Sequence, residues 1–203
     1  MKSVALLYVI QKHCASHLHY DFRLEWNGVL LSWAVPKGPS LDPSVRRLGM
    51  QVEDHPVEYA SFEGVIPEGE YGAGTVMVWD KGTWEPESAD VNAALQKGDL
   101  PFTLHGKKLK GSWVLVRTRG YGASRGRSSW LLIKHRDIEA SNRDVEAEEP
   151  YSVLSHRLLA DIARKGGGDA EKAVTCDPPT TKEPRTFSRR VRRTRARAPK
   201  EVA

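Results

Sequence analysis

Leu18-His19-Tyr20-Asp21-Phe22-Arg23-Leu24-Glu25-Trp26 alternates apolar and polar side chains without interruption. Because successive side chains of a β-strand point to opposite faces, this period of two predicts a half-buried strand. We expect the even-numbered side chains to pack into a core. The opposite face then carries an imidazole, a carboxylate and a guanidinium from His19, Asp21 and Arg23, with neighbours about 6–7 Å apart along the strand.

Segments that follow this strand also have β character. Asn27-Gly28 predicts a tight hairpin turn, because both residues tolerate positive φ, and 29–35 is the returning strand. Over 48–53 the alternation directs Leu48, Met50 and Val52 toward the core. Further short apolar runs separated by turn signals continue to residue 134, which favours an antiparallel barrel or sandwich.

Helical signals are confined to two places. Asp90 is suited to cap a short helix that runs through Gln96 and is closed by Gly98. Residues 152–164 have apolar side chains at helical spacing, and three glycines end that pattern. We therefore predict a β domain over 1–137, a linker with an amphipathic helix over 138–168, and a disordered Arg-rich tail over 169–203.

The formal net charge of +5 is unevenly distributed along the chain. Residues 1–150 carry 18 Lys and Arg against 20 Asp and Glu, whereas 151–203 carry 13 against 6. A basic arm of this kind is expected to bind polyanions such as DNA without sequence specificity, the alternative being a merely solvated tail. Any phosphate affinity of the first 150 residues must come from local clustering.

Cysteine usage and hydropathy suggest a soluble cytoplasmic protein. Cys14 and Cys176 are far apart and lie in unlike surroundings, so we do not expect a disulfide, and a reducing compartment fits. The apolar run at 4–10 is too short to span a membrane and is interpreted as a strand. No membrane partner is expected.

A candidate metal site follows from three side chains. His13 precedes His19 by six residues, and a tight connection over 14–18 would bring both imidazoles close to Asp21. Two histidines and a carboxylate suit Zn²⁺, Mn²⁺ or Fe²⁺ and leave coordination positions open for water and substrate. Histidines also occur as hydrogen-bonded core residues, so the pair alone is a weak signal.

Neighbouring cationic groups direct the interpretation toward phosphate. Arg23 carries a guanidinium that can bind phosphate through two parallel hydrogen bonds. His55, one strand away, can donate to a phosphate or transfer a proton near neutral pH. Lys37, Arg46 and Arg47 lie in predicted loops that could reach the same rim. A metal surrounded by such groups favours phosphoester hydrolysis.

Several ordered motifs strengthen this interpretation. They include Tyr8-Val9-Ile10-Gln11-Lys12-His13, Leu18-His19-Tyr20-Asp21-Phe22-Arg23-Leu24-Glu25, Ser32-Trp33-Ala34-Val35-Pro36-Lys37-Gly38-Pro39-Ser40, Glu53-Asp54-His55-Pro56 and Trp130-Leu131-Leu132-Ile133-Lys134-His135-Arg136-Asp137. Together these motifs resemble the 3′-phosphoesterase domain of bacterial DNA ligase D, over roughly residues 8–137. Since no polymerase or ligase motif accompanies them, we expect a stand-alone form.

The resemblance implies a mainly β fold, a compact antiparallel β-barrel with one or two short helices and a disordered basic C-terminal tail. It implies an Mn²⁺-dependent enzyme, with Zn²⁺ or Co²⁺ as alternatives, that removes a 3′-phosphate and a terminal 3′-ribonucleoside to leave a 3′-OH. The expected roles are metal ligands for His13, His19 and Asp21, phosphate binding for Arg23 and His55, and further active-site positions for Glu53, Lys37, Arg47 and Tyr59.

The implied partners are DNA 3′ ends and a separate ligase, polymerase or Ku-type end-binding protein near the nucleoid. Two other functions remain open on the residues alone. A non-catalytic DNA-end-binding or ligase-recruiting module would depend on the basic tail rather than on His19. A cupin-like metal oxidoreductase would also use histidines on a barrel, although Arg23 and His55 favour phosphate chemistry.

Overall fold

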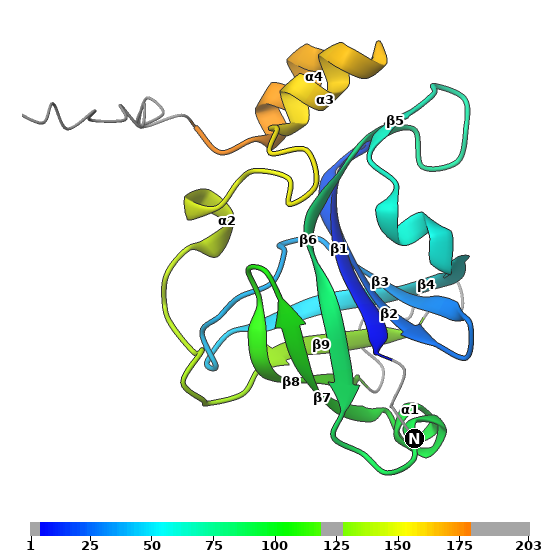
Figure 1. Cartoon of the computed structure of the whole chain (residues 1–203), viewed down its shortest axis with the longest axis vertical. Helices are drawn as coiled ribbons and strands as arrows, with labels where there is room; N and C mark the ends of the chain where they lie inside the picture. The colour runs from blue at the N-terminus through cyan, green and yellow to red at the C-terminus, as the bar shows by residue number, and fades with distance from the viewer. Residues whose placement is uncertain (1–4, 119–127, 180–203) are drawn as a thin grey trace, which may run out of the picture.

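The computed structural model describes residues 5–118 and 128–179, which form an antiparallel β-barrel with short helices (Figure 1). Eight strands close the barrel in the order β1-β2-β3-β4-β9-β8-β7-β6, because β6 also pairs with β1, and β5 is added at the edge of β6. The strands of this part of the chain are β1 (Leu6–Cys14), β2 (Leu18–Trp26), β3 (Val29–Val35), β4 (Arg46–Pro56), β5 (Gly64–Ile66), β6 (Gly74–Pro86), β7 (Asp99–Gly106), β8 (Lys110–Arg117) and β9 (Ser129–Lys134).

The alternation that predicted β2 also explains the core. Tyr20, Phe22 and Leu24 are buried inside the barrel together with Tyr8 and Ile10 of β1. Five of the six tryptophans are buried there as well and fill the interior at Trp33, Trp79, Trp84, Trp113 and Trp130. The prediction of a barrel is confirmed, and the odd-numbered side chains of β2 lie on its outer surface.

Strand β4 has the opposite orientation to the one predicted. Leu48 is 37% exposed, and Met50 is only half-buried. The inward positions belong instead to Gly49, where a Cβ would lie 3.5 Å from Trp33 Cβ, and to Gln51, whose Oε1 accepts a hydrogen bond from Trp130 Nε1. Bulky indole rings occupy the space in the core. Gly49, which has no side chain, and the hydrogen-bonded amide of Gln51 therefore face them.

The described helices are η1 (Val57–Ser61), α1 (Val91–Lys97), α2 (Val145–Glu148), α3 (Leu159–Gly166) and α4 (Ala170–Cys176), more than the one or two predicted. Helix α1 forms as expected: the Asp90 side chain accepts from Ala93 N, and Gly98 ends the helix with φ of 80°. Helix α3 begins seven residues later than the predicted pattern. None of these helices is long and apolar enough to cross a membrane.

The segment after residue 137 packs on the barrel rather than acting as a linker. Helices α3 and α4 lie together against β1, β5 and β6 (Figure 1), and their apolar side chains join the barrel core. Asp177 connects this segment to the barrel: it accepts from the backbone N–H groups of Leu159 and Ala160 and lies 3.6 Å from Lys12 Nζ. Helix α4 occupies the start of the predicted tail, while residues 180–203, with most of the arginines, lie outside the described part.

The expectation of two free cysteines is wrong. Cys14 and Cys176 form a disulfide across a sequence separation of 162 residues. The disulfide could not be predicted from local sequence patterns, because it depends on α4, which brings Cys176 to the end of β1. The bond fixes α4 beside His13, the residue before Cys14.

Breaking this disulfide is expected to lower the free energy of unfolding by up to about 5 kcal/mol, because the bond closes a loop of more than 160 residues in the unfolded chain. Urea unfolding with and without dithiothreitol measures the effect. A protein with Cys14→Ser and Cys176→Ser should be insensitive to the reductant. Identical wild-type curves in both buffers would contradict a stabilising role.

Candidate active site

The polar face of β2 forms the floor of a cavity of about 470 Å³ on the outside of the barrel. In the β1–β2 register, His13 pairs with His19 and Gln11 pairs with Asp21, so polar side chains of both strands share one face. Helix η1 packs over β1, β3 and β4 and closes one side of this face. The cavity is lined by groups from five segments of the chain, which the closed barrel holds together.

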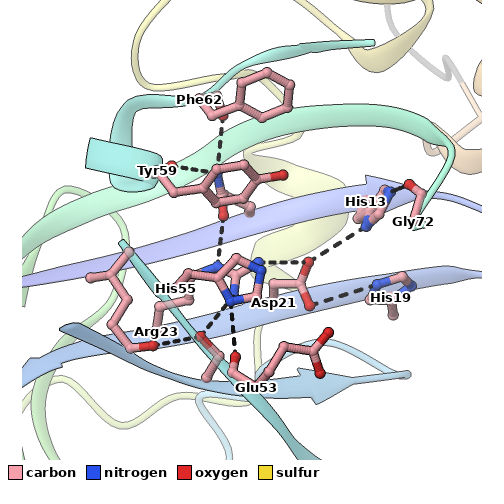
Figure 2. A network of polar contacts seen from close by, with 12 residues as sticks. His13, His19, Asp21, Arg23, Glu53, His55, Tyr59, Phe62 and Gly72 are labelled. Carbon is pink, nitrogen blue, oxygen red and sulfur yellow. Dashed lines mark hydrogen bonds and ion pairs between the residues drawn. The ribbon is translucent and has the colours of Figure 1, made fainter. Parts of the chain in front are cut away.

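His13, His19 and Asp21 converge as the sequence predicts (Figure 2). His13 Nδ1 lies 3.5 Å from Asp21 Oδ2, and His19 Nε2 lies 3.6 Å from Asp21 Oδ1. One potential ligand atom from each residue lies within 4.8 Å of the other two. The set therefore has the composition and spacing of a three-residue metal site.

Backbone contacts orient both imidazoles for this role. His13 Nε2 is 2.9 Å from the carbonyl oxygen of Gly72, and His19 Nδ1 is 3.1 Å from that of His17. A carbonyl oxygen only accepts hydrogen bonds, so each of these nitrogens is the protonated one in the neutral ring. The other nitrogen then directs a lone pair toward Asp21. Facing acceptors repel unless a proton or a metal cation lies between them, so the donor set fits a divalent metal.

Burial raises the pKa of Asp21, but the close contact with His13, the charge of Arg23 and the nearby His19 outweigh it, so the pKa lies below the ordinary value. The carboxylate is therefore ionised at neutral pH. It also contacts Arg23 Nη2 at 3.3 Å.

Arg23 is 3% exposed and is held by four partners. Its Nε donates to Gln11 Oε1 at 2.8 Å, and its Nη1 donates to Ser32 Oγ at 2.7 Å and contacts His55 Nδ1 at 2.9 Å. Its Nη2 also lies 3.3 Å from Asp21 Oδ2, while His55 Nδ1 is in addition 2.9 Å from the carbonyl oxygen of Glu53. The guanidinium therefore lines the cavity as a fixed positive charge, and a two-pronged contact with phosphate stays a prediction.

Gln11 is the residue that sequence reasoning missed. It is 0% exposed, and its Nε2 donates to the carbonyl oxygens of Tyr59 and Phe62, each at 3.0 Å, while its Oε1 accepts from Arg23. One amide therefore connects β1, η1 and the guanidinium. The available signal was its position on the same face as His13, two residues away in β1.

His55 and Tyr59 lie over the guanidinium (Figure 2). Their ring centroids are 5.1 Å apart, and Arg23 Cζ is 5.3 Å from the Tyr59 ring centroid. Burial, and then the charge of Arg23, lower the pKa of His55 below its ordinary value. Burial likewise raises the pKa of the Tyr59 hydroxyl. Both side chains are therefore neutral near pH 7 and line the cavity as hydrogen-bonding groups.

The remaining predicted site residues divide into two groups. Glu53 is exposed and lines the same cavity as His13 and His19. Lys37 and Arg47 line a separate pocket of about 320 Å³, together with Glu146. The structure therefore does not bring Lys37 and Arg47 to the cavity that contains Asp21.

Comparison with known proteins places this chain in a protein family. The family model described as the DNA Ligase D 3′-phosphoesterase domain matches residues 11–117. The chain is 57% identical over 157 residues to the "Multifunctional non-homologous end joining protein LigD" of Pseudomonas aeruginosa. The matched residues make up 76% of the chain and 18% of that protein. It is 50% identical over 113 residues to the "Multifunctional non-homologous end joining DNA repair protein LigD" of Mycobacterium tuberculosis H37Rv. This match covers 56% of the chain and 15% of that protein. The chain thus spans less than a fifth of these relatives.

Replacing Gln11 by Leu is expected to destabilise the protein by about 1–3 kcal/mol or more, because two buried carbonyl oxygens and the Arg23 N–H lose their partner. Urea unfolding measures this loss. Gln96→Leu, at an exposed position of α1, is the matched control and should change stability by no more than about 0.5 kcal/mol. Equal effects of both changes would contradict the role of the Gln11 amide.

The titration midpoint of His55 is expected to lie below 6.5 in the metal-free protein, because burial and Arg23 both disfavour its cation. Arg23→Gln should move the midpoint upward. Imidazole resonances followed by NMR between pH 4 and 8 test both expectations. A wild-type midpoint at or above 6.5 would show that His55 does not experience this environment.

Proposed function

Because the chain belongs to the DNA ligase D 3′-phosphoesterase domain family, we propose that it is a metal-dependent phosphoesterase that removes the 3′-phosphate from DNA ends. The observation that carries the proposal is the convergence of His13, His19 and Asp21 beside Arg23 in one cavity. The product is a DNA 3′-OH end, the form that a polymerase or ligase needs. Removal of a terminal 3′-ribonucleoside is an extension of the same chemistry.

His13, His19 and Asp21 would hold the metal, for which the family resemblance implies Mn²⁺, with Zn²⁺ or Co²⁺ as alternatives. When bound, the ion would supply positive charge that polarises a phosphoryl oxygen and lowers the pKa of water. The Arg23 guanidinium would bind a second phosphoryl oxygen, since charge-assisted hydrogen bonds are the stronger ones. His55, neutral and 2.9 Å from Arg23, is placed to donate to or accept from the same phosphate.

The role in repair follows from the names of the relatives, which describe non-homologous end joining. We place the chain at the step that prepares broken ends, with DNA 3′ ends as substrate. A separate ligase, polymerase or Ku-type end-binding protein would act before or after it. A non-catalytic end-binding module is the second candidate, supported by the arginines after residue 184.

His19→Ala and Asp21→Ala are each expected to abolish metal-dependent phosphate release from a 3′-phosphate primer–template, by at least about 100-fold, because each removes one of three ligands. The assay measures inorganic phosphate with Mn²⁺, Zn²⁺, Co²⁺, Mg²⁺ or chelator. His105→Ala, an exposed histidine on β7, is the matched control and should retain wild-type turnover.

The binding-module alternative has a separate test. Truncation after Pro179 removes residues 180–203 but keeps α4, the disulfide and Asp177. For a phosphoesterase, the truncated chain should still release phosphate, and His19→Ala should not. Near-wild-type turnover of folded His19→Ala would contradict the proposed site.

A further inference from the structure

The cavity has an apolar side in addition to the polar floor on β2. Beside the metal and phosphate groups, it is lined by four apolar side chains of β3, β4 and the turn after β3, namely Ala34, Pro36, Met50 and Val52. We call this set the apolar strip. Met50 and Val52 are half-buried on the outer surface of the barrel, because Gly49 and Gln51 take the inward positions of β4. Apolar side chains on an outer sheet face do not contribute to the barrel core.

Strand register fixes how the strip lies relative to the reactive groups. Asp21 pairs with Ala34, and Ala34 pairs with Met50, so these three side chains form one row across β2, β3 and β4. Two strand spacings separate Asp21 from Met50, or roughly 10 Å. Val52 is placed in the same way with respect to Arg23, through Ser32 of β3. The apolar strip therefore lies next to Asp21 and Arg23, across β3 and β4.

We propose that the apolar strip binds the base of the terminal nucleotide whose 3′-phosphate lies at Asp21 and Arg23. This inference rests on the proposed function and adds to it a subsite that contacts the terminal base. Nucleobases are flat rings with apolar faces, and pockets that bind such groups combine apolar walls with a few polar anchors.

The side chains of the strip suit this ligand. Methionine is flexible and polarisable and makes favourable contacts with aromatic rings through its sulfur. Ala34, Pro36, Met50 and Val52 have no side-chain hydrogen-bonding group that reads a base edge, apart from the weakly accepting Met50 sulfur. The subsite should accept all four bases and discriminate against an end that lacks a base.

The test compares two primer–templates that carry a 3′-phosphate, one ending in a normal nucleotide and the other in an abasic residue. Met50→Ala is expected to raise KM for the normal end about ten-fold with little change in kcat, because it removes contacts made equally in the ground and transition states. The same change should leave KM for the abasic end unaltered. Met50→Gln, which keeps the length of the side chain, provides a second variant.

Leu48→Ala is the matched control, since Leu48 is on the same strand and face but does not line the cavity. It should leave both KM values unchanged. Fluorescence anisotropy without divalent metal gives a second readout, in which Met50→Ala should weaken binding of the normal end only. If Met50→Ala affects the two ends equally, or affects neither, the subsite is refuted. Phosphate release by the wild-type chain would still uphold the proposed function in that case. No release by the wild-type chain from either primer would refute both.

Discussion

The antiparallel register of β1 and β2 is the constraint on which the remaining structure depends. It pairs His13 with His19 and Gln11 with Asp21, so that all four face outward while the alternate side chains fill the barrel. A shift of one residue in either strand would turn its polar side chains into the core. The pairing of β1 with β6 on its other edge closes the barrel. Fold and site are therefore specified by the same pairing.

The buried guanidinium of Arg23 requires polar partners on the outer face of β1 to β4. A guanidinium that is 3% exposed loses several kcal/mol of hydration, which its partners must offset. Gln11, Ser32, His55 and Asp21 supply these contacts to Arg23. Because Gln11 also donates to the backbone of η1, the guanidinium network is connected to the helix that closes the cavity. Such a preorganised site keeps its polar groups in place before a phosphate arrives.

The sequence allowed the antiparallel β architecture, the hairpin turn at Asn27-Gly28 and the shared face of His19 and Asp21 to be predicted, because these depend on patterns within single strands and turns. Features that depend on packing between distant segments were not predictable in this way. Met50 was assigned to the core because no local signal showed that indole rings would require Gly49 to face inward. Cys176 was assigned to the disordered tail, because its helix is stabilised by contacts with the barrel that no local pattern shows.

The central claim is that two histidines and an aspartate on the β1–β2 face bind a divalent metal at a phosphoesterase site. A crystal grown with Mn²⁺ and measured at the manganese absorption edge tests it most directly. A single strong anomalous peak within coordination distance of His13 Nδ1, His19 Nε2 and the Asp21 carboxylate is expected. An anomalous map with no peak there, or with its strongest peak beside Glu146 in the second pocket, would contradict the assignment.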